Sequence, residues 1–154
     1  MNSTRLHAGK SGRVFAVVLD KDEDAVPALT EFAKRERLAG SQVSAIGAFR
    51  DVVLGYFDRE RAEYRKIPIP EQVEVVSLLG DIAIGDQGPT LHLHVVVAKS
   101  DGTAHGGHLL AAHVWPTLEV VVTESPTYLR RRFDPETRLG LISIPDSRRS
   151  RRAT

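Results

Sequence analysis

The spacing of hydrophobic and polar residues changes along the chain, and this change predicts one helix followed by a series of strands. A short apolar, β-branched run at residues 13–20 indicates a buried strand. Apolar residues then recur at helical spacing, which predicts a helix over residues 25–38 with Asp24 as its N-cap. Gly40 stands where a glycine commonly ends a helix. Residues 1–11 are mostly polar, and we expect them to be a flexible lead-in.

Beyond the helix, hydrophobic residues recur at every second position, which is typical of β-strands. Two strands are expected within residues 41–58, and a turn or bend is expected at Gly80-Asp81. Residues 109–113 could form a helical turn, and Pro116 indicates an edge, a bulge or a strand start. Further strands are expected in residues 63–69, 73–79, 91–98 and 140–144. One helix, or two, with about seven strands makes an α+β domain, which we place at residues 12–146.

Composition narrows the class of protein. The 154 residues are enough for one domain with its own core, and the lack of cysteine excludes disulfides and thiolate metal ligands. No segment reaches the roughly 18 apolar residues of a membrane helix. No signal peptide is recognisable either, so we expect a cytoplasmic protein that has no membrane partner.

The net charge of +1 is unevenly distributed. Residues 147–154, which we expect to be a disordered tail, contain four arginines and no acidic residue. These are Arg148, Arg149, Arg151 and Arg152. Removing them from the 21 Lys and Arg leaves 17 basic against 20 acidic residues, a charge of −3 on the remainder. Because nucleic-acid-binding domains usually carry a basic face on the folded body, DNA binding is expected to be weak and to use the tail.

Four of the six histidines lie between His92 and His108. In a strand, residues i and i+2 point to the same face, so His92 and His94 project together. Two such imidazoles can converge on one ion at bond lengths near 2.0–2.1 Å, which is a common arrangement for zinc. A divalent metal site is therefore predicted on this strand, and it needs a third ligand from elsewhere.

The turn that follows the strand, at residues 100–103, bears on which histidine is the third ligand. In an antiparallel hairpin the numbers of opposed residues have a constant sum. A loop with an odd number of residues makes that sum even and brings His108 to the face of the first two histidines, whereas a two-residue loop favours His105 or His113. Parity alone leaves the choice open, and the spacing makes His108 the preferred candidate. The competing interpretation is a polar, solvated strand face without an ion.

Three histidines without a fourth protein ligand leave an open coordination position, as in catalytic zinc sites. A general base would have to be a nearby carboxylate, and we consider Glu74, Asp81, Glu119 and Glu124. Each is more simply explained as a solvated strand position, and no nucleophile elbow, phosphate loop or Ser/His/Asp order is visible. An enzyme is therefore less expected than a metal-binding module, with a metal-dependent enzyme acting on an unknown small molecule as the alternative.

Three stretches resemble the plants and prokaryotes conserved (PPC) domain family, in its stand-alone prokaryotic form. The first is "LHLHVVVAKSDGTAHGGHLL", followed by "LEVVVTE". The others are "SAIGAFRDVVLGYFD" and "EQVEVVSLLGDIA". The resemblance covers about residues 12–144, and the combined pattern is specific although no single stretch is.

This resemblance implies a curved, mostly antiparallel sheet with one or two helices, assembled as a homotrimer. A single sheet with few helices leaves one face uncovered, which a partner subunit can bury. Carried over by position, the metal ligands are His92, His94 and His108. The resemblance also implies a DNA-binding or regulatory role, by analogy with plant members that carry an AT-hook. This chain lacks such a hook, because "SRRSRR" has no Gly-Arg-Pro core, and its Trp115-Pro116 pair departs from the family pattern.

Overall fold

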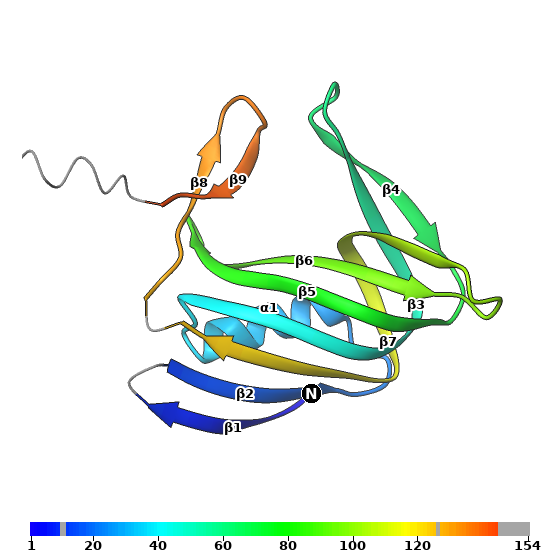
Figure 1. Ribbon diagram of the computed structural model, residues 1–154, viewed down its shortest axis with the longest axis horizontal. Coiled ribbons are helices and arrows are strands. Elements are labelled where there is room, and N and C mark those ends of the chain that lie inside the picture. Colours follow the sequence, from blue (N-terminus) through cyan, green and yellow to red (C-terminus); the bar gives the residue numbers. More distant parts are fainter. Residues whose placement is uncertain (10–11, 126, 145–154) are drawn as a thin grey trace, which may run out of the picture.

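A seven-stranded antiparallel sheet with one helix against it forms the body of the chain in the computed structural model, which describes residues 1–9, 12–125 and 127–144 (Figure 1). The spatial order of its strands is β1-β2-β7-β6-β5-β3-β4. Their bounds are β1 Asn2–Gly9, β2 Gly12–Leu19, β3 Gly40–Asp58, β4 Glu63–Ile69, β5 Val73–Gly85, β6 Gly88–Ala98 and β7 Ala104–Glu124. Helix α1 is Ala25–Arg35, and a separate two-stranded sheet consists of β8 Arg131–Asp134 and β9 Leu139–Ile142. The predicted fold class is confirmed, with α1 as the single helix among the described residues.

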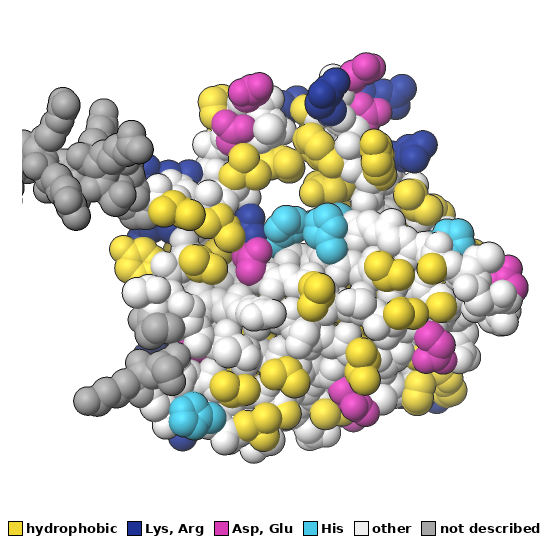
Figure 2. Space-filling model, in the orientation of Figure 1, with side chains coloured by type: hydrophobic (Ala, Val, Ile, Leu, Met, Phe, Trp, Pro, Cys, Tyr) yellow, Lys and Arg dark blue, Asp and Glu magenta, His cyan; other side chains and the backbone are white. Residues whose placement is uncertain are grey.

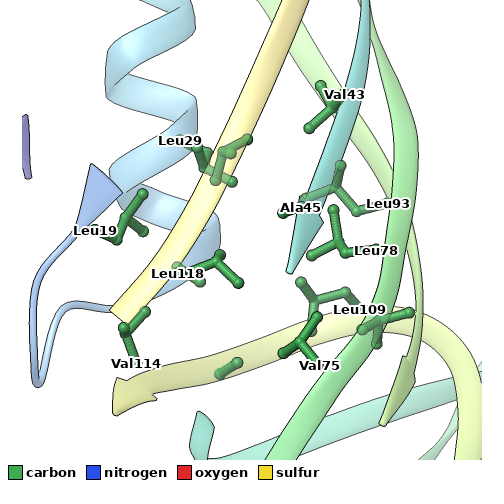
Figure 3. Packing of buried hydrophobic residues seen from close by; sticks show 14 of the residues in the cluster. Leu19, Leu29, Val43, Ala45, Val75, Leu78, Leu93, Leu109, Val114 and Leu118 are labelled. Carbon is green, nitrogen blue, oxygen red and sulfur yellow. The ribbon is translucent and has the colours of Figure 1, made fainter. Parts of the chain in front are cut away.

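The central strands close on themselves, which gives the sheet its curvature. β3 pairs with β5, β5 with β6, β6 with β7, and β7 again with β3. Apolar side chains on the enclosed face pack against Leu29 and Phe32 of α1 (Figure 3). The residues labelled there are Leu19, Leu29, Val43, Ala45, Val75, Leu78, Leu93, Leu109, Val114 and Leu118. No helix of the described residues covers the other face of these strands (Figure 1).

Helix α1 begins where the pattern predicts and ends earlier. Asp24 occupies the N-cap position, although its side chain makes no capping hydrogen bond. The helix stops at Arg35 because Arg37 takes a left-handed conformation with φ of 54°, which turns the chain before Leu38 enters the core. Gly40 is therefore not the helix terminator but the first residue of β3.

The structure has continuous strands at positions where the sequence predicts an interruption. β3 is one strand rather than two, and it bends at register shifts such as the one between Ala45 and Gly47. β5 runs through Gly80-Asp81 without a turn, and residues 109–113 are part of β7 rather than a helical turn. β7 also continues through Pro116, whose peptide bond to Trp115 is cis. A β-bulge bends a strand without ending it, so the bulged segment of β3 resembles a turn in the sequence, whereas Gly80-Asp81 stays in regular register with β6.

The N-terminal residues form a strand, so the expected flexible lead-in is wrong for Asn2–Gly9. All eight residues of β1 are exposed, and the strand pairs with β2 through its backbone. A strand exposed in this way has no alternating hydrophobic signal. The predicted tail at residues 147–154, with its four arginines, lies outside the described residues. Within the described part of the chain, no helix is long and apolar enough to cross a membrane.

Gly80 allows β5 and β6 to approach closely beside the first histidine of the cluster. It lies opposite Leu93 in the ladder. A Cβ atom at Gly80 would overlap the carbonyl oxygen of His92 and would lie 2.7 Å from Leu93 Cδ2. A side chain at this position must therefore push the two strands apart.

We expect Gly80→Ala to lower the free energy of unfolding by about 1–3 kcal/mol, the usual cost of overpacking. The matched control is Gly106→Ala, because a Cβ there meets its nearest atoms at 3.5 Å, an ordinary contact. The control should change stability by less than about 0.5 kcal/mol. Urea denaturation followed by circular dichroism measures both, and equal midpoints for the two variants would contradict the close approach at Gly80.

Candidate metal centre

β6 and β7 bring together the three predicted ligands. His92 and His94 lie on one face of β6, and His94 is directly opposite His108 of β7. The ladder ends at the pair Ala98 and Ala104, which leaves a five-residue loop, residues 99–103. The loop is odd in length, so His108 lies on the same face as His92 and His94, as the parity argument requires for an odd loop.

The turn is held by its own hydrogen bonds. The carboxylate of Asp101 accepts a bond from the backbone N–H of Thr103 at 2.9 Å and one from its hydroxyl at 2.6 Å. Gly102 has φ of 81°, a conformation that glycine adopts readily. Local turn chemistry therefore fixes the register that places His108 beside the other two histidines.

The three imidazoles converge on one point. One nitrogen atom from each ring lies within 4.8 Å of the corresponding atoms of the other two. Nε2 of His92 and Nε2 of His94 are 3.2 Å apart. Tetrahedral ligands at zinc bond lengths would be separated by about 3.3 Å, so this pair needs little adjustment. Histidine side chains are visible on the surface between the positions of the β3–β4 and β8–β9 hairpins (Figure 1 and Figure 2).

The surroundings of His92 and His108 favour the neutral form of each imidazole. Burial, and then the charges of His92, His94 and Arg131, lower the pKa of His108 to about 4. The pKa of His92 is lowered chiefly by burial as well. Tyr64 of β4 stacks on the His108 ring, with the ring centroids 4.7 Å apart. Because a metal binds the neutral imidazole, the two half-buried ligands are in the correct protonation state at pH 7.

The donor set fits a divalent metal ion. Nδ1 of His108 is buried and has no hydrogen-bond partner among the described residues. A buried polar atom without a partner is costly, and a bound ion would be one way to satisfy it. Imidazole ligands suit zinc, copper, iron and nickel.

The other histidines are placed elsewhere, so neither alternative third ligand joins the cluster. His105 lies opposite Val97, farther along the β6–β7 ladder and nearer the turn. His113 makes a 2.7 Å contact with Asp51 through its Nδ1. His7 is an exposed residue of β1.

Of the four candidate carboxylates, Asp81 is the one beside the cluster. It opposes His92 in the β5–β6 ladder and accepts a hydrogen bond from Arg131. Glu124 pairs with Arg13, Glu74 lies opposite Ala98 near the far end of the ladder, and Glu119 is exposed. Sequence reasoning missed Arg131 and Tyr64, because neither stands at a spacing that relates it to the histidines.

Relatives of this chain include proteins described by metal content and by DNA binding. A metal-containing protein of Archaeoglobus fulgidus has a TM-score of 0.80 at 38% identity, over 87% of this chain and 95% of that one. A Bacteroides thetaiotaomicron protein, whose name proposes DNA binding, has a TM-score of 0.83 at 27% identity, over 92% of this chain and 96% of that one.

The sequence is also similar to part of a longer protein. The bifunctional protein GlmU of Synechococcus sp. (strain JA-3-3Ab) is 30% identical over 128 residues, which are 81% of this chain and 19% of that protein. The chain therefore spans about a fifth of the length of the curated relative it matches. Residues 6–126 match the Plants and Prokaryotes Conserved (PCC) domain, the family that the sequence resembles. The chain therefore belongs to the Plants and Prokaryotes Conserved domain family.

Proposed function

We propose that the protein is a homotrimeric metal-binding module in which His92, His94 and His108 of each subunit hold one divalent ion, best suited to zinc. The observation that carries this proposal is the convergence of three imidazole nitrogens within 4.8 Å on a rigid hairpin. The similarity to the Archaeoglobus protein described as metal-containing supports it. When bound, the ion would cross-link β6 and β7 and would offer an open coordination position to an outside ligand.

A metal-dependent enzyme acting on a small molecule is the second candidate, and the open position is the feature that favours it. The carboxylate nearest the cluster, Asp81, is bonded to Arg131 at 2.7 Å. This carboxylate is thus already engaged in an ion pair, so we rank binding above catalysis. A cytoplasmic location stays a prediction, with which the absence of cysteine agrees.

The trimer proposal rests on an apolar patch, which we define as Ile46, Val76, Leu79, Val96 and Val121. These side chains are between 40% and 59% exposed and lie on β3, β5, β6 and β7. Hydrophobic side chains are visible over this face of the sheet in Figure 2. Exposed apolar groups gathered on one sheet face favour burial against another subunit.

The metal content of untagged protein tests the site. We expect about one zinc or similar ion per subunit by inductively coupled plasma mass spectrometry, and nearly none in His92→Ala or His94→Ala, because two imidazoles bind far more weakly than three. The matched control is His105→Ala, an exposed histidine on the same hairpin outside the cluster. It should keep the wild-type metal content, and wild-type protein that binds no zinc, even when zinc is supplied, would refute the site.

Sedimentation equilibrium tests the assembly. We expect a mass of three times the 16.9 kDa chain, and we expect the double variant Ile46→Glu/Val76→Glu to sediment as a monomer, because carboxylates cannot be buried unpaired. Leu6→Glu, at an exposed leucine of β1, is the control and should remain trimeric. A monomeric wild-type protein would rule the trimer out.

DNA binding, which the name of the Bacteroides relative proposes, is expected to be weak and to depend on the tail arginines. Four arginines can neutralise four phosphates, and each neutralised phosphate releases roughly 0.9 counterions. We therefore expect the affinity for duplex DNA to fall about 100-fold between 50 and 200 mM salt. Removal of residues 147–154 should abolish the binding in a fluorescence anisotropy titration. Sequence-specific binding that survives this truncation would show that the acidic body itself recognises DNA.

A further inference from the structure

Arg131 attaches the C-terminal hairpin, β8 and β9, to the sheet beside the histidines. Its Nη1 donates a hydrogen bond to the carbonyl oxygen of Gly140 in β9 at 2.8 Å. Its Nη2 donates to Oδ1 of Asp81 in β5 at 2.7 Å. The side chain is only 9% exposed, so this guanidinium is a buried link between the hairpin and the sheet rather than a solvated cation.

Asp81 in turn stands behind the first histidine of the cluster. Its second oxygen, Oδ2, lies 3.8 Å from Nδ1 of His92. The other nitrogen of that ring, Nε2, faces Nε2 of His94. The His92 ring thus presents one nitrogen toward His94 and the other toward the carboxylate of Asp81, which at 3.8 Å is too far for a hydrogen bond and acts on the ring through its charge.

The carboxylate of Asp81 also balances the positive charge near the histidines. Asp81 lies between Arg131 and His92, with Oδ1 2.7 Å from the guanidinium and Oδ2 3.8 Å from the imidazole, so its negative charge offsets Arg131 and favours added positive charge at the cluster. A metal ion brings such charge. Asp81 is the carboxylate paired with Arg131 within the described part of the chain, and losing it would leave a buried cation uncompensated beside the ion.

We propose that Asp81 and Arg131 are positioning residues that couple metal binding to the docking of the β8–β9 hairpin. Asp81 orients His92, and Arg131 holds Asp81 while anchoring the hairpin. This inference rests on the proposed function, because it requires a metal at the three histidines. Coupling between two equilibria is reciprocal, so a bound metal stabilises the docked hairpin and the docked hairpin stabilises the metal site.

The test uses the full-length protein with zinc alone, and it compares Asp81→Asn and Arg131→Met with Arg132→Met. Arg132 is the matched control, because it is the next residue of β8, carries the same charge and is exposed. Two quantities are measured for each protein. Competition with a chromophoric chelator gives the Kd for zinc, and hydrogen–deuterium exchange with and without zinc reports the opening of the hairpin amides in residues 131–142.

In the wild-type protein and in Arg132→Met, zinc should slow exchange in the hairpin. Asp81→Asn should raise the Kd by about 10–100-fold, as is usual when the partner of a ligating histidine is removed, and should lose the hairpin response. Arg131→Met should lose the hairpin response with a smaller rise in Kd, because Asp81 still faces His92.

The inference is overturned if Arg131→Met keeps the zinc-dependent protection of the hairpin, or if Asp81→Asn binds zinc as tightly as the control. Should Asp81→Asn fail to fold, Arg131→Met decides through the hairpin response alone. These outcomes differ from failure of the proposed function, in which the wild-type protein binds no zinc and both proposals fall together.

Discussion

The register of the β6–β7 hairpin is the constraint on which the histidine cluster depends. His94 faces His108 because five residues separate the last pair of the ladder, and Asp101 and Gly102 hold that turn in one shape. A loop longer or shorter by one residue would shift the pairing and turn the side chains of β7 toward the opposite face. A short exposed turn therefore determines whether a three-nitrogen site exists on this sheet, and the rigid strands then hold its geometry without help from mobile loops.

The sequence predicts most of the histidine cluster because the steps are local. Strand periodicity puts His92 and His94 on one face and spacing makes His108 the preferred third candidate, whereas the loop length that decides between His108 and His105 is known only from the structure. The fold class, most strand positions and the start of α1 also followed from periodicity. The predictions that were wrong also have a physical cause. An edge strand such as β1 is stabilised by backbone pairing and carries no apolar face, and bulges in β3 bend the chain where a turn was expected.

The links around the cluster could not be predicted in the same way, because they join segments that are distant in the sequence. Asp81 meets His92 through the β5–β6 register, and Arg131 reaches Asp81 from a hairpin 50 residues farther along the chain. No spacing rule connects these three residues. Tyr64 likewise reaches His108 only because β4 folds back along β3. Sequence periodicity thus identifies the candidate ligands, whereas the groups that surround them emerge only from tertiary pairing.

The apolar patch and the candidate metal ligands share one face of the sheet, and this continuity relates the proposed assembly to the proposed site. Leu79 opposes His94 directly in the β5–β6 ladder, and Val96 follows His94 on the same face of β6. A subunit that buries Leu79 and Val96 would border His94, which is the exposed member of the cluster. It would exclude water from one side of the ion and strengthen the electrostatic contribution of Asp81. Metal affinity and subunit affinity are therefore expected to influence each other through the boundary formed by Leu79 and His94.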